Sequence, residues 1–287
     1  MARFQIMSDL HLEAPSTYDV FSITPKSSCL ALLGDVGNIK DKGFFQFLEA
    51  QLKRFEHVFF LLGNHEPYHS TWAKVKAQLQ DFSNKIDQRR SAKKGDDGRL
   101  GKLIFLDQTR YDLSSEITIL GCTLYSQVLS SQHDRVSFGL NDFYHIEDWT
   151  VEQHCAAHQA DLEWLNAQVA EISAREPNRK IVVFTHHSPS TAEGTSDAAH
   201  KSSPISSGFS TDLSKEECWV NQSVKLWAFG HTHFNCDFED PETKKRLVSN
   251  QRGYYFAQAT AFDPDRVYEV KQGATEAWIP YIALPWP

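Results

Sequence analysis

Short apolar runs recur along the chain and predict buried strands. They lie at Phe4–Met7, Cys29–Leu33, Val58–Leu62, Ile181–Phe184 and Leu226–Phe229. Most are nearly continuous in hydrophobic residues instead of alternating, which is typical of strands covered on both faces. Glycine or a small polar residue follows each run, where a strand would turn into a loop. The pattern predicts an α/β protein.

Helical periodicity alternates with these runs. Phe44, Leu48, Leu52 and Phe55 share one helical face before the third strand. A longer stripe advances in steps of four and three residues and predicts an amphipathic helix that ends before Pro177. Its members are Val151, Cys155, His158, Leu162, Leu165, Val169 and Ile172.

Toward the C-terminus the pattern changes and predicts a second sheet, more mixed or antiparallel than the first. Its expected strands are Ile117–Tyr125, Tyr254–Ala257 and Val267–Val270. We expect loops at residues 84–102, which are highly charged, and at residues 188–215, which are rich in Ser, Thr, Gly, Ala and Pro. Neither an internal repeat nor an interdomain linker is visible, so we expect a single domain over residues 1–287.

Candidate metal ligands follow the five predicted strands. In open α/β sheets ligands bind beyond the carboxyl ends of strands. Residues two apart on a strand extension can face the same side, as for Asp9 with His11 and for His231 with His233. The segments are Asp9-Leu10-His11, Gly34-Asp35, Gly63-Asn64-His65-Glu66, Thr185-His186-His187 and Gly230-His231-Thr232-His233.

The donor set predicts a binuclear metal centre. Carboxylate, amide and imidazole donors without thiolate favour two ions of Mn, Fe or Zn. Asp35 is the natural bridge, because one carboxylate can contact two cations, and Asn64 offers a neutral carbonyl oxygen. Two divalent ions, Asp9, Asp35 and a bridging hydroxide would leave a net charge of about +1. Such a centre attracts phosphate and can lower the pKa of bound water from about 16 to about 7.

These five motifs, in this order, resemble the calcineurin-like metallophosphoesterase superfamily, and they span residues 9–233. The resemblance implies a four-layer α/β/β/α sandwich of two mixed sheets flanked by helices. It also implies that the first of the two adjacent histidines, His186, is a ligand, and that His65 contacts the substrate or protonates the leaving oxygen. The ligands implied for the first metal are Asp9, His11, Asp35 and His233. Those implied for the second metal are Asp35, Asn64, His186 and His231.

One departure from the superfamily is informative. Its protein Ser/Thr phosphatases extend the second motif with an Asp-Arg pair, where this chain has Asn38 and Ile39. The arginine that clamps phosphate and the aspartate that orients the histidine are therefore missing. The chain looks more like the broad group of small metallophosphoesterases than like a protein phosphatase.

The sequence thus predicts an enzyme, a metal-dependent phosphoric ester hydrolase. We expect a metal-bridging hydroxide to attack a small phosphomonoester or phosphodiester, with Asp35, Asn64 and His65 as catalytic residues. Four further residues are candidates for substrate contact, although each could instead serve packing, capping or a backbone hydrogen bond. They are His187, Asn141, His145 and Tyr68. The alternatives are a catalytically weak metal-binding scaffold of the same fold, or a nuclease.

Composition and charge restrict the expected binding partners and the cellular compartment. A net charge of −8, from 29 basic and 37 acidic residues, does not favour binding to long nucleic acid or to an anionic membrane. Five cysteines without a CxxC motif favour a reducing compartment, so we expect a cytoplasmic protein. We expect no membrane span and no signal peptide, since no apolar run approaches the roughly 18 residues needed and the N-terminus enters a strand at once. Nothing in the sequence predicts an oligomeric state.

Overall fold

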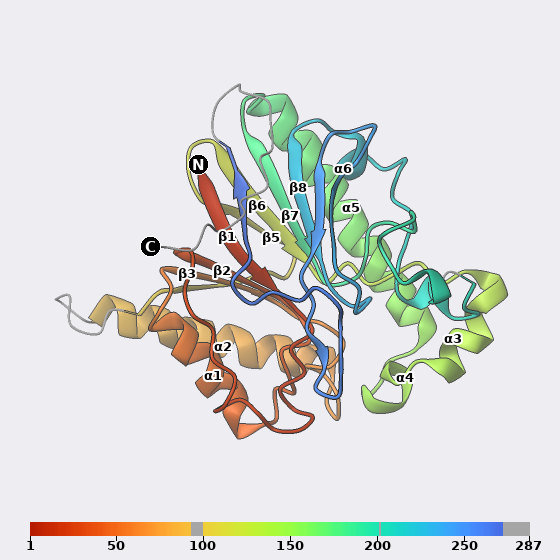
Figure 1. Ribbon diagram of the computed structural model, residues 1–287, viewed down its shortest axis with the longest axis horizontal. Coiled ribbons are helices and arrows are strands. Elements are labelled where there is room, and N and C mark those ends of the chain that lie inside the picture. Colours follow the sequence, from red (N-terminus) through yellow and green to blue (C-terminus); the bar gives the residue numbers. More distant parts are fainter. Residues whose placement is uncertain (93–99, 201, 272–287) are drawn as a thin grey trace.

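Two β-sheets form the centre of the molecule, seen in Figure 1 as a computed structural model that describes residues 1–92, 100–200 and 202–271. The five-stranded sheet has the order β13-β1-β2-β3-β4, and the six-stranded sheet has the order β5-β6-β7-β8-β10-β9. The first comprises β1 Ala2–Met7, β2 Cys29–Leu33, β3 His57–Leu61, β4 Lys102–Phe105 and β13 Val267–Val270. The second comprises β5 Thr109–Asp112, β6 Ile117–Cys122, β7 Lys180–Thr185, β8 Val224–Phe229, β9 Cys236–Glu239 and β10 Arg246–Ser249.

Helices cover the outer face of each sheet (Figure 1). Helices α1 (Lys42–Leu52) and α2 (Trp72–Ala92) pack with the first sheet, and α5 (Val151–Arg175) and α6 (Glu217–Val220) pack with the second. The short helices α3 (His133–Gly139) and α4 (Asp142–His145) lie between β6 and α5 in the chain. The fold is therefore the predicted α/β/β/α sandwich.

The strands are continuously apolar because both of their faces are buried. In β2, Leu30 and Leu32 pack into the core beneath α1 and α2, whereas Ala31 and Leu33 pack into the core between the sheets. The same inter-sheet core receives Phe184 from β7. Each of the buried leucine and phenylalanine side chains contributes about 1.5–3 kcal/mol of hydrophobic stabilisation. The two cores hold the parallel strands in register, and their carboxyl ends therefore form a fixed platform.

The expected C-terminal sheet is only partly correct. Strand β6 does lie in the second sheet, which is mixed as expected, since β6 runs antiparallel to β5 and parallel to β7. Strand β13 instead returns to the first sheet, where it pairs antiparallel with β1. The expected strand at residues 254–257 is a separate hairpin of β11 (Gly253–Tyr254) and β12 (Ala257–Gln258). Local sequence patterns do not specify which distant strand an edge strand will join.

The expected loop at residues 84–102 is wrong over its first part. Helix α2 continues to Ala92, because Leu79 and Ile86 extend its buried face while the charged residues lie on the exposed face. Strand β4 begins at Lys102, and residues 93–99 lie outside the described part of the chain. Residues 188–215 are irregular, as expected, apart from short 3-10 turns at Ala198–His200 and Ser206–Gly208; residue 201 is not described.

Two expectations from composition can be compared with the structure. All five cysteines are free, as expected for a chain without a disulfide framework. None of the helices within the described ranges combines the length and the apolar character required to cross a bilayer.

Candidate metal centre

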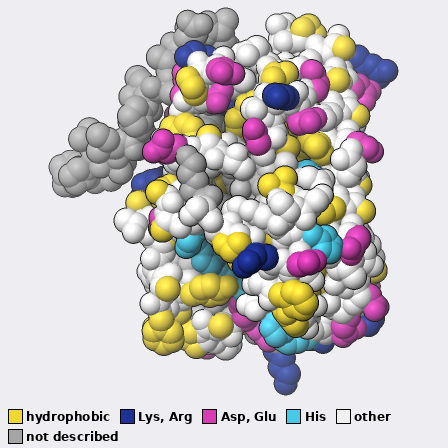
Figure 2. Space-filling model, turned by 90° about the vertical axis from the view of Figure 1, so that its right-hand side faces the viewer, with side chains coloured by type: hydrophobic (Ala, Val, Ile, Leu, Met, Phe, Trp, Pro, Cys, Tyr) yellow, Lys and Arg dark blue, Asp and Glu magenta, His cyan; other side chains and the backbone are white. Residues whose placement is uncertain are grey.

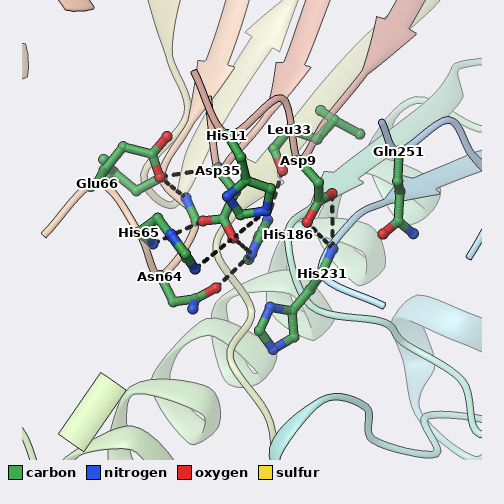
Figure 3. A network of polar contacts seen from close by, with 12 residues as sticks. Asp9, His11, Leu33, Asp35, Asn64, His65, Glu66, His186, His231 and Gln251 are labelled. Atoms are coloured by element: carbon green, nitrogen blue, oxygen red, sulfur yellow. Dashed lines mark hydrogen bonds and ion pairs between the residues drawn. The ribbon is translucent and has the colours of Figure 1, made fainter. Parts of the chain in front are cut away.

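The carboxyl ends of five strands bring the predicted ligands together. Asp9 and His11 follow β1, Asp35 follows β2, and Asn64 follows β3. The second sheet supplies His186 after β7, and His231 with His233 after β8. Figure 3 shows most of these side chains pointing toward a common centre from both sheets. The convergence follows from parallel strands, whose carboxyl ends all lie at one edge.

Backbone hydrogen bonds join the loops that carry these side chains. The amide of Asp9 donates to the carbonyl of Gly34 (3.0 Å), and that of His11 donates to the carbonyl of Asp35 (3.0 Å). In the second sheet, the amide of Gly230 donates to the carbonyl of His186 (2.8 Å). Each loop is therefore positioned by its neighbour.

Most of the predicted ligands have a left-handed backbone. The φ angles are 53° at Asp9, 46° at His11, 51° at Asp35, 70° at His231 and 48° at His233. Few non-glycine residues adopt this region, and those that do concentrate at functional sites, where the surrounding structure maintains the strain. This conformation turns each side chain from the end of its strand toward the centre.

Two glycines allow the loops to approach one another. Gly34 has a φ of +85°, and a Cβ atom there would lie 2.5 Å from the backbone nitrogen of Gly63. A Cβ at Gly63 would lie 2.1 Å from Oδ1 of Asp35. Any side chain at Gly63 would therefore displace the carboxylate that lies between the two sheets.

The predicted Asp and His ligands fall into two groups, one of which contains Asp35. Asp9, His11 and His233 make one group, and Asp35, His186 and His231 make the other, with donor atoms in each group lying within 4.8 Å of one another. Oδ2 of Asp35 lies 3.5 Å from Nε2 of His186 and 3.9 Å from Nε2 of His11. The grouping matches the two ligand sets implied by the resemblance. The metal-binding roles themselves stay predictions.

The orientation of the donor atoms fits metal ions. Nδ1 of His186 donates to the carbonyl of Leu33 (2.8 Å), and this hydrogen bond leaves the Nε2 lone pair directed toward the centre. Nε2 of His11 and Nε2 of His233 face each other at 3.0 Å. Nε2 of His231 is buried without any hydrogen-bond partner. A buried unpaired acceptor is costly in a protein, but it is ready to bind a cation.

Electrostatics at the centre favour cations. Burial would raise the pKa of Asp35, but the neighbouring imidazoles of His186 and His65 hold that pKa well below its ordinary value. Burial lowers the pKa of His186, yet attraction to Asp35 and Asp9 outweighs it and raises that pKa to about 10. Burial and the charge of His186 push the pKa of His231 well below its ordinary value. A cation would replace protons on these imidazoles, since metal ligands bind deprotonated.

Glu66 orders the loops around the centre. Its carboxylate is buried and accepts backbone N–H bonds from Asp35 (3.1 Å), Val36 (2.8 Å) and Gly63 (2.8 Å). One side chain thus fixes both the loop after β2 and the loop after β3 (Figure 3).

Sequence reasoning missed three residues of this site. Glu13 accepts hydrogen bonds from Nδ1 of His65 (2.9 Å) and Nδ1 of His11 (3.2 Å). Asp142 accepts hydrogen bonds from the side-chain amide of Asn64 (2.8 Å) and from the hydroxyl of Tyr68 (2.8 Å). Of these two residues, only Glu13 could have been suspected from the sequence, because it lies two residues beyond the predicted ligand His11.

The third missed residue is Tyr254, on the hairpin of β11 and β12. Its ring packs on His11 with centroids 4.2 Å apart, and its hydroxyl lies 3.4 Å from Nε2 of His65. The amide of Gly253 donates to the carbonyl of Asp9 (3.0 Å), which joins the hairpin to the loop after β1. A lone tyrosine far from the motifs gave no sign of this placement.

A cavity of about 880 Å³ opens over the centre. Its lining includes Asp35, Asn64, His65, Tyr254 and residues of the 188–215 loop. On the face of the molecule drawn in Figure 2, exposed histidine side chains lie mainly in the lower half, beside hydrophobic side chains.

The four candidate substrate contacts differ in their relation to this cavity. Tyr68 and Asn141 line it. His187 does not, since it is fully buried with its ring packed against that of His231, at a centroid distance of 4.1 Å. His145 is not part of the lining either; its ring lies 5.1 Å from that of Tyr68.

A centre of carboxylate, imidazole and amide donors at one end of an α/β/β/α sandwich is typical of metal-dependent hydrolases. The model of the calcineurin-like phosphoesterase family matches residues 2–235, so the chain belongs to this family. It is therefore a metal-dependent phosphoric ester hydrolase. The hairpin with Tyr254 lies beyond the matched residues.

Three proteins are similar to most of this chain in sequence or in fold. Uncharacterized protein L509 of Acanthamoeba polyphaga mimivirus is 26% identical over 290 residues, covering 95% of this chain and 98% of that protein. The fold is similar to that of a phosphopantetheinyl hydrolase from Mycobacterium tuberculosis, with a TM-score of 0.62, 17% identity and coverage of 88% of this chain and 90% of that one. It is also similar to that of a dimetal phosphatase from Danio rerio, with a TM-score of 0.51, 12% identity and coverage of 88% of each chain.

Proposed function

We propose that the protein hydrolyses a small phosphoester at a centre of two metal ions of the Mn, Fe or Zn type. The observation that carries the proposal is the convergence of six Asp and His side chains in two groups, with Asn64 beside His186 (3.0 Å) and with Nε2 of His231 buried and unpaired. Asp9, His11 and His233 would hold one ion, and Asn64, His186 and His231 the other. Asp35 would contact both. When bound, the two ions would supply Lewis-acid activation of water and neutralise phosphate charge.

The residues of the chain have separate tasks in this proposal. Asp142 accepts hydrogen bonds from Nδ2 of Asn64 and from the hydroxyl of Tyr68. The bond to Nδ2 orients the side-chain amide of Asn64, so that its carbonyl oxygen faces Nε2 of His186 (3.0 Å). His65 presents Nε2 to the cavity, where it can donate a proton to the departing oxygen. The hydroxyl of Tyr254 lies beside that atom and can donate to a phosphoryl oxygen.

The cavity favours a substrate with an organic group larger than a methyl or ethyl ester. Its volume is in the range of pockets that bind metabolite-sized ligands. Apolar side chains from two segments, Leu129, Leu140, Ile205 and Phe209, line it together with several serines and threonines. An uncharged group with hydroxyl or amide functions suits this surface.

Charge favours a phosphodiester over a phosphomonoester. The described lining residues include the carboxylates Asp35, Asp142 and Asp212, and none of those described is lysine or arginine. A diester carries one negative charge and a monoester close to two at neutral pH, so the carboxylates of the lining repel a monoester more strongly than a diester. The same charges do not favour a nuclease for long nucleic acid, which requires a basic surface.

A panel of esters tests the proposal. Protein reconstituted with Mn²⁺ should hydrolyse bis(4-nitrophenyl) phosphate faster than 4-nitrophenyl phosphate, and EDTA should abolish both reactions. Activity that survives complete metal removal, or no hydrolysis of any ester in the panel, would contradict the metal-dependent function. A faster reaction with the monoester would contradict the diester preference alone.

A further inference from the structure

We infer that Glu13 is a positioning residue for His65, and that it fixes this imidazole for proton transfer to the departing oxygen. The inference rests on the proposed function, because it concerns the same site. Nothing in the family motifs assigns a role to Glu13, which lies two residues past His11 on the segment that leaves β1.

One carboxylate oxygen makes both contacts. Oε1 of Glu13 accepts from Nδ1 of His65 (2.9 Å) and from Nδ1 of His11 (3.2 Å). An imidazole that donates through Nδ1 presents Nε2 on its opposite side. For His65 that side faces the cavity, where Nε2 lies 3.4 Å from the hydroxyl of Tyr254 and 3.9 Å from Oδ2 of Asp35.

The ring of His65 is enclosed on its other sides. Tyr68 stacks on it at a centroid distance of 4.4 Å, and His11 meets it edge-on at 4.5 Å. The backbone amide of His65 donates to Oδ1 of Asp35 (2.8 Å). Packing therefore limits where the ring lies, while the hydrogen bond to Glu13 determines which nitrogen faces the substrate.

Asn38, at the position where the superfamily's protein phosphatases carry the orienting aspartate, does not make this contact. Its side chain donates to the carbonyl of Tyr68 (3.2 Å) and accepts from the amide of Lys40 (3.0 Å). Glu13 has a side-chain exposure of 16% and reaches His65 from a different segment. The carboxylate–imidazole pair is thus present in this chain, with the carboxylate supplied by the first loop.

The test separates an effect through His65 from an effect through the metal ligand His11. Glu13→Leu removes both hydrogen bonds with little change of volume, and Glu13→Gln keeps an acceptor oxygen but removes the charge. Both variants are compared with wild type. The matched control is Glu147→Leu, which removes an exposed glutamate that is paired with Lys74. The substrates are a nitrophenyl ester, which needs no proton on its leaving oxygen, and an alkyl ester with the same phosphoryl group, which does.

We expect Glu13→Leu to lower kcat on the alkyl ester by roughly 10–100-fold, as for other residues that orient a functional histidine. The loss on the nitrophenyl ester should be much smaller, and Glu13→Gln should lie between wild type and Glu13→Leu. Metal content should stay at the wild-type value. In the background of His65→Ala, the Glu13 substitution should cost little, because the group through which it acts is gone.

Equal losses on the two esters, a lowered metal content, or additive effects of Glu13→Leu and His65→Ala would overturn the inference. Nitrogen-15 NMR of the histidine rings provides a measurement that does not need activity. In wild type, Nδ1 of His65 should carry a proton that is hydrogen-bonded to Glu13, in addition to the proton on Nε2 that is donated to the departing oxygen. An Nδ1 signal that is the same in wild type, Glu13→Gln and Glu13→Leu would overturn the inference even if the leucine variant folded poorly. A wild-type protein inactive on both esters would instead count against the proposed function.

Discussion

The substitution Glu66→Gln tests how the metal-binding loops are held. The Glu66 carboxylate accepts three buried N–H groups, two on Oε2 from Asp35 and Gly63 and one on Oε1 from Val36. A glutamine has one oxygen and one nitrogen, and the nitrogen cannot accept. In its better orientation the amide keeps the bonds from Asp35 and Gly63 and leaves the N–H of Val36 facing an NH₂ group.

The cost can be worked out from these contacts. One buried N–H without a partner costs about 1–3 kcal/mol. Burial and the neighbouring Asp35 raise the pKa of Glu66 to about 8, so at neutral pH no loss of acceptor charge adds to this cost. About 1–3 kcal/mol is a sizeable share of the 5–15 kcal/mol typical of a folded domain. Metal affinity should fall as well, because the loop that carries Asp35 loses its hydrogen bond from Val36 and is held less tightly to the loop that carries Asn64.

Urea unfolding of the metal-free proteins measures the effect. Glu49→Gln is the matched control, since Glu49 forms an exposed ion pair with Arg89 (2.8 and 3.0 Å), and such pairs contribute at most about 1 kcal/mol. A midpoint for Glu66→Gln that differs from wild type by no more than that of the control would refute the reasoning.

Three further substitutions have definite expected results. Asp35→Asn should lose both metal ions and nearly all activity, and full metal occupancy in this variant would contradict the bridging role. Tyr254→Phe should slow hydrolysis about tenfold, the value of one hydrogen bond of about 1.4 kcal/mol, whereas Tyr255→Phe, one residue away on the same hairpin, should not. Burial lowers the pKa of His154 to about 3, so the folded state does not take up the proton that the unfolded state binds below about pH 6.5. His154 should therefore cost about 2 kcal/mol of stability between pH 6.5 and 5, and His154→Gln should flatten the dependence of unfolding free energy on pH by that amount; an unchanged slope would exclude it.

Much of the fold and of the candidate site could be predicted from sequence because both depend on local patterns. A continuous apolar run predicts a strand buried on both faces, and the next polar residue lies at the carboxyl end, as for Asp9 and Asp35. Once the strands are parallel, these residues must come close. The left-handed backbone that turns them inward is not visible in the sequence.

The remaining features depend on contacts between distant segments. Glu13, Asp142 and Tyr254 reach the centre through loops and a hairpin whose paths are set by tertiary packing. Strand β13 joins the first sheet through pairing with β1, which no local pattern specifies. The end of α2 was mistaken for a loop because its exposed face is as charged as a loop.

The measurement that tests the central claim most directly is anomalous diffraction from crystals of the Mn²⁺-loaded protein. We expect two peaks, one among Asp9, His11 and His233 and the other among Asn64, His186 and His231, with Asp35 contacting both. A single peak, or peaks away from these side chains, would contradict it.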